Sequence, residues 1–259
     1  MPSATRWIDA LQRSHDHLAG FVSGLTPEQL RAQSVCTDWE VSQVLSHLGS
    51  AGEINRLGLE AVLNGTEAPP NEPIWDRWNA MSPDQRAREF IASDAAHLAL
   101  LDTLDDAARD SLRFNLGFLA EPIDLATSVG MRLAEHAFHS WDVFATFDPE
   151  ATVDQPSTEL LARRASPFFR YLANGEWVGD PGSIELHLAD PDLTFTLEVG
   201  GEAALNTGGA NDPIGHVDIP AEAWLRLTYG RLDPEHTPGD IKSEPSDLVD
   251  RLRGLFKGL

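Results

Sequence analysis

Residues 37–54 read TDWEVSQVLSHLGSAGEI, and the organisation of the first half of the chain follows from this stretch. Its apolar residues recur at three- and four-residue spacing, which is typical of one buried face of an α-helix. These residues are Val41, Val44, Leu45 and Leu48. Thr37 and Glu40 have the Thr-x-x-Glu spacing of a capping box, so we expect the helix to open there and to end near Asn64-Gly65.

Three further stretches with helical spacing surround this one, at about residues 5–25, 82–104 and 123–147. Thr26-Pro27 and Ser82-Pro83 have the chemistry of a helix N-cap followed by proline in the first turn. We expect residues 67–73 to form a proline-rich loop and residues 105–122 to be irregular. Four long helices in about 150 residues predict a helical bundle.

The second half of the chain changes to a mixed pattern. Residues 184–188 and 193–197 alternate like strands around turn residues, which predicts a β-hairpin, and residues 216–219 predict another strand. Helices are expected at 157–173, 221–229 and 246–256. The predicted fold class is therefore an α-helical domain over residues 1–150 followed by a smaller α+β domain over residues 151–259.

Composition excludes several classes of protein. The chain has 259 residues, with 41 acidic side chains against 19 lysines and arginines and a formal charge of −22. A phosphate-backbone binder needs clustered basic residues, so neither nucleic acid nor an anionic membrane surface is an expected partner. No stretch reaches the ~18–20 uncharged apolar residues that cross a bilayer, and no apolar signal core opens the chain. These features predict a cytoplasmic protein.

The single cysteine, Cys36, cannot form an internal disulfide or a cysteine-based zinc site, which fits a reducing compartment. No basic neighbour in the sequence would activate its thiol. If the protein carries out thiol chemistry, we expect the sulfur to arrive on a cofactor.

Three residues are candidate metal ligands. His47 lies in the middle of one predicted helix, and Glu135 and His139 lie at positions i and i+4 of another, on one face. Two nitrogens and one carboxylate oxygen, with positions left open, suit a catalytic divalent ion such as zinc. Asp142 is placed to orient the His139 imidazole as a hydrogen-bond acceptor.

Spacing alone leaves alternatives open. His136 and His139, at i and i+3, form a competing ligand pair, and the pattern also admits a hydrogen-bonded core histidine at position 47 with Glu135 on a solvated face. Trp39 and Trp141 are expected to pack in the core. The remaining histidines are expected at the surface or in helix caps: His15, His17, His97, His187, His216 and His236.

Two segments of the sequence resemble those of a known protein family. DWEVSQVLSHL at 38–48 and EHAFHSWD at 135–142 resemble the DinB-type fold and, more specifically, the mycothiol-dependent maleylpyruvate isomerase family. The likeness covers nearly the whole chain and implies a metal-binding, DinB-like four-helix bundle followed by an α+β domain similar to sterol carrier proteins. The family's metal ligands correspond to His47, Glu135 and His139, so the resemblance selects Glu135 over His136.

The resemblance also implies an activity. The chain would be a mycothiol-dependent isomerase or thiol S-transferase that uses a divalent metal, zinc, and mycothiol as the thiol cosubstrate. Its substrate would be a small, carboxylate-bearing electrophile. The stretch AEAWLRLTYGRL at 221–232 resembles a family segment in which the arginine after the glycine is implicated in activity, here Arg231. Arg231 equally fits dipole compensation at a helix C-terminus, and Arg226 is expected at the surface.

Two other functions remain open from the sequence. The second domain could hold an apolar or acyl ligand, with the bundle serving only as structure. Alternatively, a metal could generate hydroxide for hydrolysis, with His136 or Asp142 as the general base.

Overall fold

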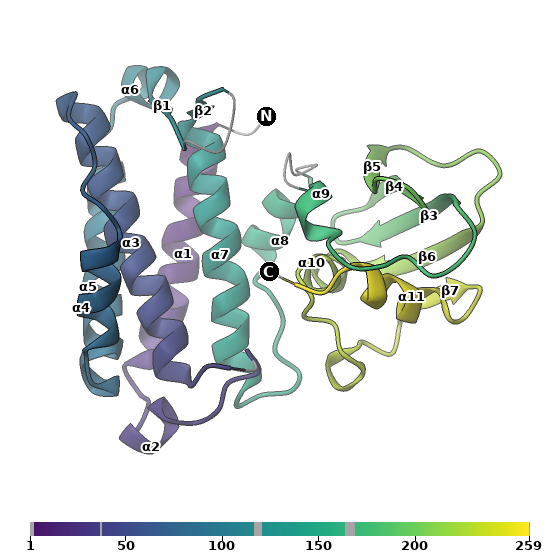
Figure 1. Cartoon of the computed structure of the whole chain (residues 1–259), viewed down its shortest axis with the longest axis horizontal. Coiled ribbons are helices and arrows are strands. Elements are labelled where there is room, and N and C mark those ends of the chain that lie inside the picture. The colour runs from purple at the N-terminus through teal and green to yellow at the C-terminus, as the bar shows by residue number, and fades with distance from the viewer. Residues whose placement is uncertain (1–2, 37, 117–120, 164–168, 259) are drawn as a thin grey trace. The chain divides into compact units, whose positions relative to one another are not determined.

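The computed structural model describes residues 3–36, 38–116, 121–163 and 169–258 (Figure 1). The chain divides into two compact units, Met1–Ala151 and Thr152–Leu259. The first is a helical bundle and the second an α+β unit with a five-stranded mixed sheet, which confirms the predicted fold class.

Four long helices build the first unit. They are α1 (Ala4–Val22), α3 (Val41–Asn64), α5 (Pro83–Asp102) and α7 (Leu125–Ala145). Helix α3 packs against α5 and α7, and α1 packs against α7 and α5 (Figure 1). The apolar positions that predicted the helix over 41–64 are fully buried, since Val41, Val44, Leu45 and Leu48 are all 0% exposed. The core thus lies along the predicted apolar stripes.

The helix starts and stops agree with the sequence except at one position. Thr26 caps α2 (Pro27–Leu30) and Ser82 caps α5, each in a reciprocal capping box with a glutamine. Gly65 ends α3 at φ 63°, a left-handed conformation that glycine adopts without steric cost. Helix α3 itself begins at Val41 with Glu40 as its cap, and Gln43 closes the box, so the predicted opening at Thr37-x-x-Glu40 was wrong. Thr37 lies outside the described residues.

Two short helices were not predicted. Helix α4 (Glu72–Asn79) replaces the end of the predicted loop, and α6 (Asp106–Ser111) lies in the segment predicted to be irregular. Strands β1 (Arg113–Phe114) and β2 (Ile123–Asp124) pair antiparallel beyond α6. Helix α4 is stabilised by tertiary packing, because Ile74 and Trp78 are buried and the Trp78 ring fills the space beside Gly49. A six- or eight-residue helix has little stability without such packing.

The second unit contains a sheet with strand order β5-β4-β3-β6-β7. The predicted hairpin is β3 (Gly182–Ala189) and β4 (Leu193–Val199), and the predicted third strand is β6 (Gly215–Pro220), which runs parallel to β3. The two edge strands, β5 (Ala204–Thr207) and β7 (Lys242–Glu244), were not predicted because they are only four and three residues long.

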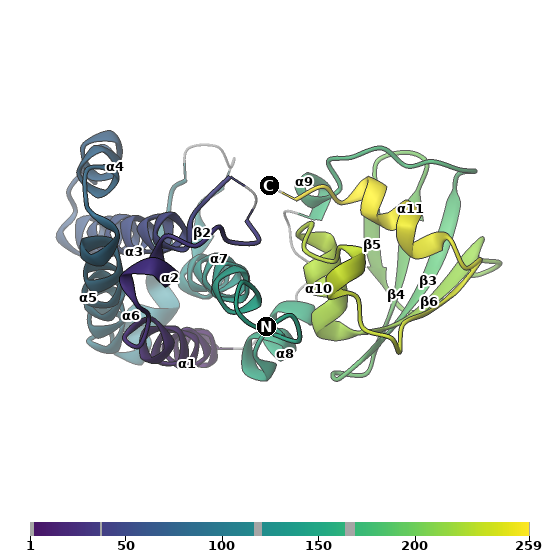
Figure 2. The same cartoon turned by 90° about the horizontal axis from the view of Figure 1, so that it is seen from below.

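Helices cover one face of this sheet. Helices α10 (Ala221–Thr228) and α11 (Leu248–Leu255) contact strand β6 and lie over the same face (Figure 2). The buried residues of β3, Ile184, Leu186 and Leu188, alternate along the strand as a half-buried strand requires. The described part of the segment predicted to be helical at 157–173 forms α8 (Gln155–Ala162) and α9 (Phe169–Leu172), and η1 (Pro234–His236) is a single short turn.

None of the helices that the structure describes combines the length and the apolar character needed to cross a membrane.

Candidate metal centre

The three predicted ligands lie together on two facing helices of the bundle. Helix α7 presents Glu135 and His139 on one face, and α3 brings His47 to the same place. The His47 Nε2 atom is 3.1 Å from Glu135 Oε2, and the His139 Nε2 atom is 3.8 Å from the same oxygen. One potential ligand atom from each residue lies within 4.8 Å of the others. The two imidazole rings meet edge to face, with centroids 4.6 Å apart.

The surroundings hold the His139 ring in a defined orientation. Its Nδ1 atom is 2.8 Å from Asp142 Oδ2, and Asp142 is buried. A carboxylate on one ring nitrogen favours a proton there, which leaves the other nitrogen as a lone-pair donor. The centroid of the Trp39 ring lies 5.8 Å from that of His139 and 5.2 Å from that of His47, so this tryptophan lines the site. Trp39 is partly buried. Trp141 is buried in the core, as predicted.

The carboxylate at the centre of the cluster is held in its charged form. Burial by itself would raise the pKa of Glu135, but the hydrogen bond with His47 and the neighbouring His139 outweigh it and lower the pKa to about 2. The Glu135 side chain is 46% exposed and that of His47 is 35% exposed. The cluster therefore contains a charged carboxylate that small molecules can reach.

These residues fit a divalent metal ion. Tetrahedral ligands with bonds of about 2.0–2.1 Å lie roughly 3.4 Å from one another, close to the 3.1 and 3.8 Å separations between the histidine nitrogens and the Glu135 oxygen. Three protein ligands would leave a position for an exogenous molecule, and Asp142 supplies the carboxylate acceptor that the other ring nitrogen of a zinc-binding histidine usually has.

Comparison with known proteins identifies the family. The sequence profile described as "Mycothiol maleylpyruvate isomerase N-terminal domain" matches residues 11–144. The chain belongs to this family. The matched region includes His47, Glu135 and His139.

Solved structures show the same fold over the whole chain. A crystal structure of the mycothiol-dependent maleylpyruvate isomerase matches with a TM-score of 0.65 at 12% identity, covering 95% of this chain and 94% of that chain. A structure of that enzyme with a histidine replaced by alanine matches with the same TM-score and coverage at 13% identity. No curated protein sequence matches this chain.

The first unit of this maleylpyruvate isomerase family member contains a second polar cluster, which was not predicted. The Asp94 carboxylate, on α5, lies 2.6 Å from Arg132 Nη2, 3.0 Å from His136 Nε2 and 3.2 Å from His15 Nδ1. All four residues are buried, so the expectation that His15 lies at the surface or in a cap was wrong. Ser14 adds a contact of 2.8 Å to the other nitrogen of His136.

This buried cluster differs electrostatically from the partly exposed one. His15, Asp94 and His136 also offer three potential metal ligands within 4.8 Å. Arg132, however, already neutralises the carboxylate. Burial alone would raise the pKa of Asp94, but Arg132 and His136 hold it well below its usual range. Burial lowers the pKa of His136. The cluster therefore contains an Arg–Asp pair whose charges compensate each other, as expected of a network that connects three helices.

His136 and His139 belong to different clusters. Its ring points into the bundle toward Asp94, so His136 and His139 do not form a common site. A signal for the buried network was present in the sequence. Asp94 lies four residues from both Phe90 and Leu98, on the apolar stripe of its helix, where an unpaired carboxylate would be costly.

Cys36 lies closer to the site than its sequence neighbours indicated. Its sulfur and ligand atoms of His139 and Asp142 fall within 4.8 Å of one another, and the side chain is partly buried. The expectation that Cys36 has no basic neighbour holds along the sequence but not in space.

The arginines of the second unit have different environments. Arg231 is partly buried just beyond α10, and its Nη1 donates to the Tyr229 carbonyl oxygen at 3.0 Å. Gly230, at φ 71°, makes the turn that precedes it. Arg226 was expected at the surface but is only 2% exposed, because its guanidinium pairs with Glu222 and donates to the His236 carbonyl oxygen.

Proposed function

We propose that this protein is a metal-dependent enzyme that uses a low-molecular-weight thiol, mycothiol, on a small electrophilic substrate. The reaction would be either a cis–trans isomerisation or the transfer of the thiol to the substrate. Family membership supports the thiol, and the His47, Glu135 and His139 cluster supports the metal. The observation that carries the proposal is the convergence of these three side chains from two helices, with Asp142 behind His139.

The metal would supply acidity. A divalent ion such as zinc, when bound, favours deprotonation of a coordinated thiol, which would give a thiolate nucleophile near neutral pH. Within the chain, Glu135 provides negative charge, Asp142 orients His139, and Trp39 covers one side of the two imidazoles. These residues pre-organise the site, so little rearrangement is needed when ligands bind.

The isomerisation would proceed by addition and later expulsion of the thiolate. The thiolate would add to one carbon of a conjugated cis double bond, and the electron pair would move to the adjoining carbonyl oxygen as an enolate. Rotation about the resulting single bond and expulsion of the thiolate would then give the trans product. In the S-transferase alternative the adduct would take up a proton and persist. Arg231 is the residue that we propose to hold a substrate carboxylate, by a charge-assisted hydrogen bond.

Hydrolysis is less well supported. It would need a general base beside the open metal position. His136 faces Asp94 inside the bundle, and Asp142 is engaged with His139. Neither of the two bases that the sequence offered is placed to act on water at the site.

Metal analysis tests the proposal. We expect about one divalent ion per chain in the purified protein, loss of that ion in His47→Ala and in His139→Ala, and its retention in His216→Ala, an exposed histidine of strand β6. Metal-free wild-type protein after purification and challenge with zinc would overturn the proposal. So would full occupancy in both His47→Ala and His139→Ala.

Thiol dependence is tested separately. Turnover of electrophiles should require mycothiol and should survive Cys36→Ser, because the protein's own thiol is not the nucleophile. Thiol-independent turnover of esters or amides would favour hydrolysis. Turnover that is lost in Cys36→Ser, with metal still bound, would contradict the role that we assign to an external thiol.

A further inference from the structure

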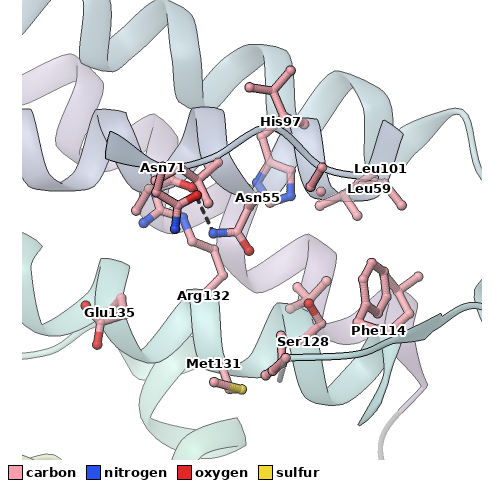
Figure 3. A pocket seen from close by; sticks show the side chains of 18 of the residues that line it. Asn55, Leu59, Asn71, His97, Leu101, Phe114, Ser128, Met131, Arg132 and Glu135 are labelled. Carbon is pink, nitrogen blue, oxygen red and sulfur yellow. Dashed lines mark hydrogen bonds between the residues drawn. The ribbon is translucent and has the colours of Figure 1, made fainter. Parts of the chain in front are cut away.

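A cavity of about 340 Å³ lies inside the first unit, next to the candidate metal centre. Helices α3, α5 and α7 form its walls, and the segment after α3 together with strands β1 and β2 closes it (Figure 3). Glu135 is one of its lining residues, so the cavity adjoins the metal candidates. Ala68 and Pro69, which also line it, are exposed and bring that side of the cavity to the surface. Its size falls within the range of small-molecule sites, about 300–1,000 Å³.

Most of the lining is apolar. Leu59, Leu101 and Phe114 are apolar residues of the lining, and Asn55 and Asn71 are polar ones (Figure 3). Ile54, Leu57, Ile123 and Met131 add further apolar surface. An apolar cavity of this size favours a ligand with a hydrocarbon or aromatic body, because burying apolar surface stabilises a complex.

Two buried polar side chains line the cavity and have nitrogen atoms without a partner. Arg132 and His97 are each 3% exposed. The Arg132 Nη2 atom donates to Asp94 and to the Leu48 carbonyl oxygen, whereas Arg132 Nε and Nη1 and His97 Nδ1 have no hydrogen-bond partner among the described residues. His97 was expected at the surface or in a cap, and the structure corrects this.

Unpartnered buried donors are costly. A donor removed from water without a partner loses its hydrogen bond to water, and the loss is larger when the donor is charged. A ligand that supplies an acceptor to Arg132 would recover part of that cost. The two open nitrogens of the guanidinium thus indicate a polar contact within an otherwise apolar site.

The charges around the cavity do not favour a dianion. Arg132 is already paired with Asp94, and the Glu135 carboxylate lines the same space. Burial and the nearby Arg132 lower the pKa of His97 to about 4, so this ring adds no positive charge near neutral pH. A neutral acceptor, such as a carbonyl oxygen, meets the Arg132 donors without bringing a second negative charge toward Glu135.

We propose that this cavity binds a small, largely apolar molecule that carries one neutral carbonyl group, with the carbonyl oxygen accepting a hydrogen bond from Arg132. This inference deepens the proposed function and rests on it for the ligand's role, because a carbonyl-conjugated electrophile held here would lie beside Glu135. The part of the acceptor substrate that enters this cavity is then apolar and carries the carbonyl group, and it carries no carboxylate.

Ligand binding tests the inference without any catalytic readout. Benzylacetone, butylbenzene and maleate are the probes, and saturation is followed by ligand-observed NMR on protein as purified and after chelator treatment. Benzylacetone and butylbenzene differ only by the carbonyl oxygen. We expect benzylacetone to bind about tenfold more tightly than butylbenzene, as one recovered hydrogen bond implies, and maleate to compete with neither.

Two variants test whether benzylacetone binds in the cavity. Ser128→Leu fills the cavity from α7 and should weaken benzylacetone binding at least about tenfold. Ala96→Leu adds the same bulk at an exposed position of α5 and should change nothing. Circular dichroism confirms that both variants remain folded.

The outcomes separate this inference from the proposed function. Absence of saturable benzylacetone binding, equal affinity for benzylacetone and butylbenzene, or stronger binding of maleate would each overturn it, whatever the metal analysis shows. Benzylacetone binding that persists in the chelated protein would support the inference even if the proposed metal chemistry failed.

Discussion

His97 makes the stability of the bundle depend on pH in a way that one substitution can isolate. Burial, and then the positive charge of Arg132, lower the pKa of this imidazole from 6.5 to about 4. Below pH 6.5 the His97 imidazole takes up a proton in the unfolded chain, whereas in the folded chain it stays neutral down to about pH 4. The free energy of unfolding therefore falls as the pH falls through this window. The shift implies a loss of about 2 kcal/mol between pH 7 and pH 5.

The perturbation is His97→Gln, which keeps a polar side chain but cannot take up a proton. Urea unfolding is followed by fluorescence of the buried tryptophans at pH 7 and pH 5. The wild-type protein should lose about 2 kcal/mol more than the variant over this interval. Acid destabilisation through His136, whose pKa burial also lowers, affects both proteins and cancels in the difference.

The matched control is His187→Gln in strand β3. His187 is exposed, and its hydrogen bonds to Asp192 and Asp218 raise its pKa, so its effect on stability has the opposite sign. This variant should lose at least as much stability on acidification as the wild type. Equal losses in wild type and His97→Gln would refute the reasoning, because they would mean that the imidazole is not buried in its neutral form.

Three further outcomes are expected. Asp142→Asn should weaken zinc affinity about 10- to 100-fold in a competition titration, because His139 loses its orienting carboxylate; unchanged affinity would contradict the hydrogen bond's role. Asp94→Asn should destabilise the bundle by about 3–5 kcal/mol in urea unfolding, since it leaves the buried Arg132 charge uncompensated; a loss below about 1 kcal/mol would show that the pair is not a structural tie. Removal of bound metal by a chelator should lower the melting temperature of the bundle and zinc should restore it; an unchanged melting curve in both steps would argue against a native-state site.

Local sequence features predicted the bundle elements because their causes are local. The stripe from Val41 to Leu48 and the caps at Thr26 and Ser82 act within one or two helical turns, and these elements appear where expected. Helix α4 was not predicted because its stability comes from burial of Trp78 against α3. This contact joins residues that are far apart in the sequence.

The candidate site was predictable only in part. The i, i+4 spacing places Glu135 and His139 on one face of α7, and His47 was a candidate from its place in another predicted helix. The family resemblance added the choice of Glu135 over His136. Spacing left His136 as a competitor. The rotation of α7 within the bundle separates the two histidines. His136 faces inward to Asp94, and His139 faces His47.

By itself, the sequence determined the four amphipathic helices and the change to an α+β pattern after about residue 150, and it gave one candidate ligand set, His47, Glu135 and His139. These features follow from local periodicity and residue chemistry. Only the tertiary structure decided which polar residues are partners. Asp94 and Arg132 come from different helices, and their pairing depends on how those helices pack. The cavity beside Glu135 has the same origin, because empty space is defined by several elements at once and by no single stretch of the chain.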